Sequence, residues 1–326
     1  MPLCINFVLG EALLLLILFL EIFQGETVKK KALIIGSTAV DVIIEIDSLP
    51  KTGDDVNTKS QVLNVGGCAY NVASMLSYLS KDFDLISPVG SGFYGDFINQ
   101  TLVQKGFSVP LDRVREENGC CYCFVERGGE RSFVCHRGAE YVFRDEFFKG
   151  INPAEYEIIY FCGLDLSGDS DDSIIRFLEN ATKNCTLNHP KLFFAPGPQI
   201  ANIPRGILEQ IFALDPMLHL SKSEYEVLSC EFGSAEDITH LTGAPLIITH
   251  GSEGAFLITP ASCGINKVHV PSQPVEKIVD TIGAGDAHAG SVISCLLDGK
   301  TLSESIKFAN TMAAKVIEIK GSTLLR

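Results

Sequence analysis

The residues best suited to chemistry in this chain lie in one run, residues 279–290, where a turn of small residues precedes an acid. Gly283, Ala284 and Gly285 come directly before Asp286, and the apolar spacing after them predicts a helix. Backbone N–H groups at a helix N-terminus have no intrahelical partner and carry the positive end of the helix dipole, so small residues there let an anion approach. Phosphate is the anion that such a turn suits. The carboxylate of Asp286 would repel phosphate. Its position is explained if it acts as the base for a hydroxyl that attacks the phosphate.

The simpler interpretation of Gly-Ala-Gly-Asp is a turn whose aspartate caps a helix, which is common in α/β proteins. The elements around the turn help to decide. Short apolar runs at 158–162, 192–195 and 246–249 predict strands, and segments such as 173–181 and 224–230 predict helices between them. This alternation is typical of a parallel sheet with helices on both faces.

The N-terminal half is less regular. Residues 31–36 and 41–47 predict two strands, whereas residues 49–63 are polar and rich in turn-forming residues. A Gly-Gly turn inside residues 119–136 predicts a β-hairpin.

Composition excludes some classes of protein. A chain of 326 residues with 46% hydrophobic content can bury a large core. The formal net charge of −14 argues against a non-specific nucleic-acid binder, which needs a basic face. Eleven cysteines are an odd total that suits free thiols better than a disulfide framework, so a reducing, cytoplasmic location is expected.

The first 27 residues predict an apolar extension, with the functional domain spanning residues 28–326. The apolar run at 12–20 is too short to cross a bilayer, and residues 1–10 lack the Lys or Arg with which a signal peptide begins. We therefore expect neither a membrane span nor an export signal.

Two nucleotide-binding motifs are absent. A dinucleotide-binding strand would be followed by Gly-x-Gly-x-x-Gly, but no second glycine follows Gly36 closely. A phosphate-binding P-loop would need glycine where Ser294 stands, five residues before Gly299-Lys300-Thr301. A nicotinamide enzyme and a P-loop kinase are both disfavoured.

The sequence Asp-Thr-Ile-Gly-Ala-Gly-Asp-Ala-His-Ala-Gly, residues 280–290, closely resembles the C-terminal signature of the ribokinase-like, or PfkB, carbohydrate kinase family. The resemblance implies that Asp286 is the catalytic base and that the three small residues before it form an anion hole. It also implies that Asp280 and Thr281 lie near a site for a monovalent cation such as K⁺. The fold implied is an α/β fold, a three-layer α/β/α ribokinase-like domain with a mainly parallel central sheet and a small β lid at about 46–63 and 119–136.

Motifs nearer the N-terminus resemble the substrate-binding motifs of the same family. Gly36 with Asp41 resembles the first, and Gly66-Gly67 with Asn71 resembles the second. The resemblance implies that Asp41, Gly66, Gly67 and Asn71 bind substrate. Carboxylate and amide groups suit hydroxyl recognition because buried polar groups reject analogues that lack the hydroxyl.

Motifs later in the chain resemble those with which the family binds the nucleotide. Glu224 matches the glutamate of the family's Asn-x-x-Glu motif, which holds Mg²⁺ through water, while Ser221 replaces the asparagine. Thr249, Gly251 and Gly254 match the loop that holds the nucleotide, and Asn310 lies near where the family packs adenine. The cofactors implied are ATP and Mg²⁺, with K⁺ at the Asp280 site.

The resulting prediction is an ATP-dependent kinase for a sugar or sugar-derivative hydroxyl. One alternative is a nucleoside kinase of the pseudouridine, cytidine or adenosine type, for which Tyr122, Phe124 or Phe133 of the lid could stack on a base. A second alternative is a catalytically silent sugar-binding regulator. The expected partner is a small sugar or nucleoside, with no nucleic acid and no membrane. Dimers that pair through their lids are common in the family, so the resemblance also implies a homodimer.

Overall fold

The computed structural model describes residues 31–166, 172–183 and 189–324, and Lys31–Arg326 form one compact unit. The predicted N-terminal extension, residues 1–27, lies outside the described residues. Among the helices of the described part, none is long and apolar enough to cross a membrane.

The central sheet has eight strands in the order β12-β11-β10-β9-β8-β7-β1-β4. Its six strands from β10 to β4 are parallel, and β11 and β12 are added antiparallel at one edge. Their bounds are β1 (Ala32–Ile35), β4 (Phe83–Ile86), β7 (Ile158–Cys162), β8 (Lys191–Ala195), β9 (Met217–Ser221), β10 (Leu246–Thr249), β11 (Ala255–Pro260) and β12 (Ile265–Val270). The predicted parallel sheet is therefore confirmed.

Helices cover both faces of this sheet because its strands are apolar on both sides. In β1, Ala32 and Ile34 belong to one core cluster, whereas Leu33 and Ile35 belong to the other. The first cluster includes α2 (Cys68–Tyr78), α3 (Gly92–Lys105), α8 (Ala284–Leu297) and α9 (Leu302–Ile317). The second includes α4 (Ser173–Lys183), α5 (Arg205–Phe212), α6 (Lys222–Phe232) and α7 (Ala235–Thr242). The predicted three layers are present.

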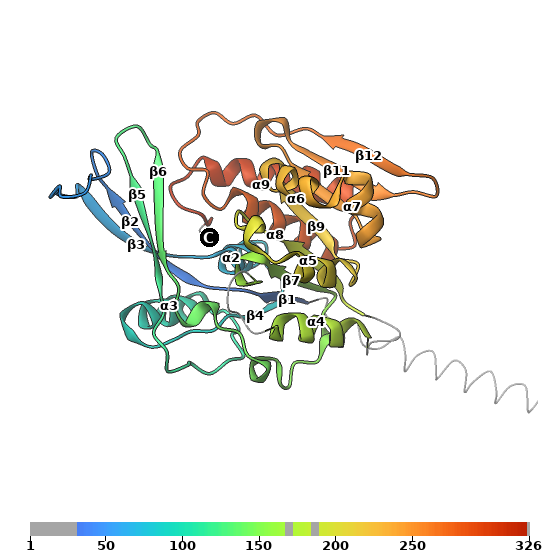
Figure 1. Cartoon of the computed structure of the whole chain (residues 1–326), viewed down its shortest axis with the longest axis horizontal. Helices are drawn as coiled ribbons and strands as arrows, with labels where there is room; N and C mark the ends of the chain where they lie inside the picture. The colour runs from blue at the N-terminus through green and yellow to red at the C-terminus, as the bar shows by residue number, and fades with distance from the viewer. Residues whose placement is uncertain (1–30, 167–171, 184–188, 325–326) are drawn as a thin grey trace, which may run out of the picture. The chain divides into compact units, whose positions relative to one another are not determined.

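A separate four-stranded sheet, which we call the small sheet, has the order β3-β2-β5-β6. It stands at the left of Figure 1, where the β5–β6 hairpin rises beside the C-terminal segment. Its strands are β2 (Ala39–Glu45), β3 (Ser60–Gly66), β5 (Cys120–Val125) and β6 (Arg131–His136), and the hairpin predicted around the Gly-Gly turn is confirmed.

Residues 60–63, which lie in the polar, turn-rich stretch 49–63 of the sequence, fall within the range 46–63 that the resemblance assigns to the β lid. They begin β3, an edge strand whose residues are mostly half-exposed or exposed, so the apolar signal of a buried strand is missing. The small sheet also includes β2, which precedes the lid ranges expected from the resemblance.

The two faces of the small sheet differ because side chains alternate along each strand. Val40, Val42 and Ile44 of β2 are buried in the first core cluster, and Tyr122 and Phe124 of β5 pack against it. The opposite face carries three registered rows. The first holds Asp41, Cys121 and Cys135, the second Ile43, Cys123 and Phe133, and the third Glu45, Val125 and Arg131.

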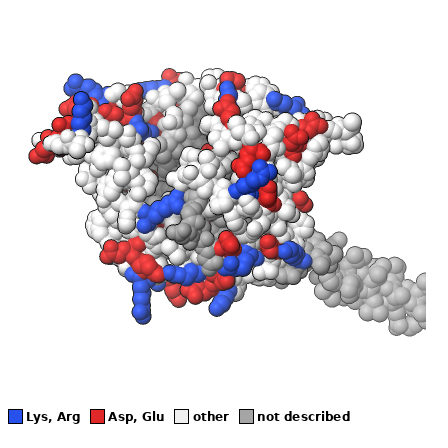
Figure 2. Space-filling view, in the orientation of Figure 1, with Lys and Arg blue, Asp and Glu red and all other residues white. Residues whose placement is uncertain are grey.

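Charged groups of both signs are interspersed on the molecular face shown in Figure 2, and among the described residues no broad basic patch is visible on that face. This distribution accords with the net charge of −14.

Candidate active site

A pocket of about 220 Å³ opens where four parallel strands end. The last residues of β7, β8, β9 and β10 all line it, and these are Cys162, Ala195, Ser221 and Thr249. Its other walls include Cys68, Tyr160, Gly197, Pro198, His219, Glu224, Gly283, Gly285, Asp286 and Ala289. In open α/β sheets ligands bind beyond the carboxyl ends of the strands, so the position is that of a ligand site.

The small residues of the turn before Asp286 let other groups come close to its backbone. Gly283 caps α8 with φ of 74°, a left-handed conformation that favours glycine. A Cβ added there would lie 2.5 Å from the Cβ of Ser322, so a larger residue would displace the C-terminal segment. Ala284 and Gly285 form the first turn of the helix, where backbone N–H groups lack intrahelical acceptors.

Asp286 is held by a hydrogen-bond chain. Asn71 Nδ2 donates to Asp286 Oδ2 at 2.8 Å, and Ser322 Oγ donates to Asn71 Oδ1 at 2.9 Å. Asn71, expected to bind substrate, therefore uses its amide to orient the carboxylate. The pKa of Asp286 is raised to about 6, mainly by burial. The charges of Glu224 and Asp41 contribute to the rise, and hydrogen bonds from Asn71 and Cys68 oppose it.

Asp41 approaches the same region from the small sheet. Its carboxylate leans over Gly66, where an added Cβ would lie 2.1 Å from Asp41 Oδ2, so a larger residue there would push the carboxylate aside. Gly67 caps the N-terminus of α2. Burial raises the pKa of Asp41 to about 6. The structure thus brings Asp41, Gly66, Gly67 and Asn71 to the side of Asp286 that faces the small sheet.

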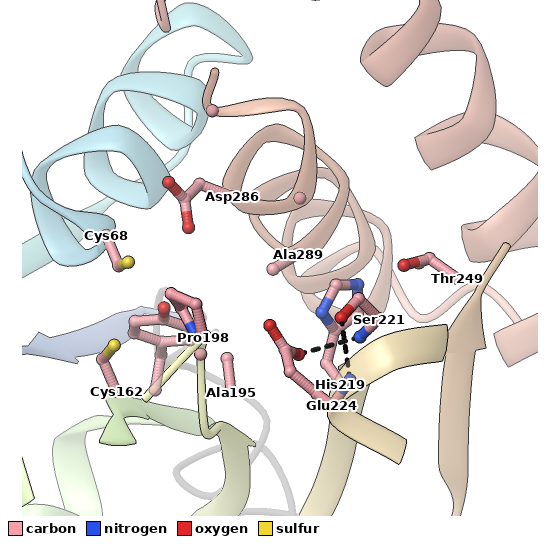
Figure 3. A pocket seen from close by; sticks show the side chains of 14 residues that line it. Cys68, Cys162, Ala195, Pro198, His219, Ser221, Glu224, Thr249, Asp286 and Ala289 are labelled. Carbon is pink, nitrogen blue, oxygen red and sulfur yellow. Dashed lines mark hydrogen bonds between the residues drawn. The ribbon is translucent and has the colours of Figure 1, made fainter. Parts of the chain in front are cut away.

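Glu224 and Ser221 form a capping box at the start of α6. Glu224 Oε2 accepts from the Ser221 backbone N–H at 2.8 Å, and Ser221 Oγ accepts from the Glu224 N–H at 3.2 Å. Figure 3 shows the other Glu224 oxygen directed into the space that Asp286 also faces. Burial raises the pKa of Glu224. Among the described residues no group of three or more His, Cys, Asp or Glu side chains could hold a metal.

The expected nucleotide residues divide into two groups. Thr249 lines the pocket, and Gly251 and Gly254 shape the tight turn that follows β10. Asn310 is buried and does not line the pocket, since its Nδ2 donates to the carbonyls of Val270 at 3.1 Å and Pro271 at 2.9 Å.

Asn310 instead ends a buried polar chain that the sequence analysis misses. Because its Nδ2 is the donor, its Oδ1 accepts from His288 Nε2 at 3.2 Å. His288 Nδ1 then accepts from His219 Nε2 at 2.9 Å, with both rings neutral. Burial lowers the pKa of His288 to about 4 and lowers that of His219 as well. His219 lines the pocket, so a fixed array of dipoles runs from its wall into the core.

Two thiols also lie in the site. Cys68 and Cys162 both line the pocket, and Figure 3 shows them on the same side of it as Asp286. Its hydrogen bond with Cys162 and its burial raise the pKa of Cys68, which keeps it a neutral thiol. The position of Cys162 at a strand end is a signal that could have found it.

Asp280 is buried, at 6% exposure, whereas Thr281 is exposed. The Asp280 carboxylate contacts Arg131 of the small sheet, with 2.8 Å between Arg131 Nη1 and Asp280 Oδ1. Sequence reasoning did not single out Arg131.

Known proteins resemble this chain over nearly its whole length. An uncharacterized sugar kinase, YegV, of Escherichia coli (strain K12) is 30% identical over 302 residues, which cover 90% of this chain and 91% of that protein. The structure of Arabidopsis thaliana ribokinase complexed with ribose and ATP is 21% identical, with a TM-score of 0.73 and coverage of 90% of this chain and 94% of that one.

A Burkholderia thailandensis nucleoside kinase in complex with inosine is 20% identical, with a TM-score of 0.73 and coverage of 89% and 92%. These likenesses confirm the predicted ribokinase-like fold. The family model described as pfkB family carbohydrate kinase matches residues 29–325. Together with the resemblance to the sugar kinase, this match shows that the chain belongs to the pfkB family of carbohydrate kinases.

Proposed function

We propose that this enzyme transfers the γ-phosphoryl group of ATP to a primary hydroxyl of a small sugar, with Asp286 as the catalytic base. The observation that carries the proposal is the position of Asp286. Its carboxylate lies at the N-terminus of α8, in a pocket at the strand ends, and Asn71 fixes its orientation. A pKa of about 6 leaves it ionised at neutral pH and still basic enough to accept a proton.

The positions of the residues support a separate role for each of them. Asp41 reaches the substrate side from the small sheet, where its carboxylate can accept hydrogen bonds from sugar hydroxyls. Asp286 accepts the proton of the attacking hydroxyl. The N–H groups of Gly283, Ala284 and Gly285 stabilise the negative charge of the transferring phosphoryl group, and the small sheet acts as a lid that excludes water.

The nucleotide would lie on the other side of Asp286, along Thr249 and the turn with Gly251 and Gly254. Mg²⁺, when bound with ATP, neutralises charge on the phosphates. Glu224 fits a role in holding it through water, because one carboxylate oxygen is fixed by Ser221 and the other faces the pocket. One or two carboxylates with substrate phosphates are a common set for this ion.

The test is a panel of pentoses, hexoses, their derivatives and nucleosides, scored by substrate-dependent ADP release. We expect at least one sugar to raise ADP release well above the rate without acceptor. If none of the acceptors raised ADP release, the result would contradict kinase activity and favour the silent regulator.

A nucleoside acceptor is supported by one side chain. Phe133 is 56% exposed and shares the Asp41 face of the small sheet, where it could stack on a base. Tyr122 and Phe124, the other aromatic candidates, pack toward the core. A response to nucleosides alone in the same panel would favour this second function.

The pH profile is a separate prediction. Asp286 must be ionised to accept a proton, so kcat/KM should fall about tenfold per pH unit below its pKa of about 6 and level off above it. The control is the Asp112→Asn variant, in which the substituted residue is exposed and belongs to none of the site motifs. A rate that stays constant from pH 5 to 8, with chemistry rate-limiting, would contradict Asp286 as the base.

A further inference from the structure

We infer that Arg131 of the small sheet supplies the positive charge that the family resemblance assigns to a monovalent cation at Asp280, so that phosphotransfer here does not depend on K⁺. The inference rests on the proposed function for its kinetic test. It makes Arg131 a positioning residue for the anion-binding turn.

Three donors already bind the Asp280 carboxylate. Its Oδ1 accepts from Arg131 Nη1 at 2.8 Å and from the Ile282 N–H at 2.9 Å, and its Oδ2 accepts from the Gly321 N–H at 3.2 Å. K⁺ needs several oxygen ligands in place of its hydration shell, and the guanidinium of Arg131 occupies one side of this carboxylate. A cation at these carboxylate oxygens would also lie beside the guanidinium charge. The residues present therefore do not fit K⁺ at Asp280.

The ion pair is sheltered from water, which strengthens it. Asp280 has 6% exposure and the Arg131 side chain 24%. Although its burial opposes the shift, hydrogen bonds from Arg131 and from the two backbone N–H groups hold the pKa of Asp280 below its ordinary value. The carboxylate thus stays ionised, with its charge matched by the arginine.

The register of the small sheet explains how Arg131 reaches the turn. Arg131 pairs with Val125, and Val125 pairs with Glu45, so Arg131 lies on the face that carries Asp41. Glu45, in the same row, forms a second ion pair of 3.1 Å with Lys320 of the C-terminal segment. One row of the small sheet therefore holds both segments that flank the site.

A chain of hydrogen bonds connects the Arg131–Asp280 ion pair to Asp286. Asp280 binds the Gly321 N–H, the neighbouring Ser322 hydroxyl donates to Asn71, and Asn71 donates to Asp286. Asp280 also binds the N–H of Ile282, next to the N-cap Gly283. Loss of the Arg131 charge should therefore loosen the turn and misplace the carboxylate.

The experiment compares turnover in KCl, NaCl and tetramethylammonium chloride at one ionic strength, with an acceptor found in the panel. We expect the wild-type rates in the three salts to agree within the error of the assay. Arg131→Gln should be at least about tenfold slower in tetramethylammonium, because misplacing a catalytic group by about 1 Å can cost about 10²-fold in rate. Its rate should recover in part with KCl, as the ion enters the place that the guanidinium leaves. Arg131→Lys keeps the charge and should stay independent of K⁺.

The matched control is Arg127→Gln, at the turn of the same hairpin, where the arginine side chain is 82% exposed. It should behave as the wild type in all three salts. A wild-type rate that K⁺ raises tenfold or more, or an Arg131→Gln variant that matches the wild type in tetramethylammonium, would overturn the inference.

A second readout does not need activity. The midpoint of thermal unfolding should rise more with KCl than with NaCl in Arg131→Gln, but not in the wild type. A K⁺-specific rise in the wild type would contradict the inference. Should no acceptor be phosphorylated, the proposed function fails while this melting series still decides the role of Arg131. Should Arg131→Gln not fold, the wild type and Arg131→Lys decide it.

Discussion

Replacing Asp286 with Asn should lower the phosphotransfer rate by about 10²–10⁴-fold, the usual contribution of a general base, while the fold is kept. Asparagine has nearly the same size, and its carbonyl oxygen can still accept the hydrogen bond from Asn71. It cannot accept the proton of an attacking hydroxyl. The measurement is single-turnover phosphotransfer beside circular dichroism. A variant that retained the parent rate would remove Asp286 from the mechanism.

The same variant should be more stable than the wild type at pH 8. Burial raises the pKa of Asp286 from 3.8 to about 6, so the folded protein binds more protons than the unfolded chain between these values. The contribution of the Asp286 carboxyl to the free energy of unfolding is therefore fully present below pH 4 and is lost as the pH rises through 6. At pH 8 the ionised carboxylate costs up to about 3 kcal/mol, which asparagine avoids.

Urea unfolding at pH 8 and at pH 4 tests the sign. The stability gained by Asp286→Asn should shrink at the lower pH, and Asp112→Asn, at an exposed position, should show no such change. A variant that is less stable than the wild type at pH 8 would show that the ionised carboxylate is well compensated in the folded state.

Replacing Asp41 with Ala should weaken sugar binding by about 10–150-fold, the effect of losing hydrogen bonds to a charged group, and leave ATP binding nearly unchanged. Asp41 reaches the site from the small sheet, whereas the expected nucleotide residues follow β9 and β10. Titration calorimetry with each ligand measures the two affinities separately.

The control for Asp41 is Asp47→Ala, beyond the exposed end of the same strand, where the side chain is 69% exposed and pairs with Lys59. It should change neither affinity. Equal losses of sugar and ATP binding in Asp41→Ala would contradict the division of the site into a substrate side and a nucleotide side.

Local patterns in the sequence were enough to predict much of this fold. The apolar runs at 158–162 and 246–249 coincide with β7 and β10, and the glycine turn before Asp286 does begin a helix. These features depend on spacing within a few residues. Composition alone does not indicate the strand β3, because an exposed edge strand has little apolar signal to detect.

Contacts between distant residues could not be predicted in this way. Asn71 and Asp286 are separated by 215 positions, and nothing local tells whether an amide binds a ligand or a neighbouring carboxylate. His288 lies inside the signature, yet its partner His219 becomes visible only when β9 and α8 are packed together. Arg131 belongs to no motif, and only the register of the small sheet brings it to Asp280.

The most direct test of the proposed function is the ³¹P NMR spectrum of the product formed by the wild-type enzyme from Mg·ATP and the best sugar in the panel. We predict ADP and a new phosphate monoester whose resonance is split by the two protons of a CH₂ group, as transfer to a primary hydroxyl requires. The Asp286→Asn variant should give this signal far more slowly. ADP with inorganic phosphate alone, or an equal rate of ester formation in both proteins, would contradict phosphoryl transfer to a sugar with Asp286 as the base.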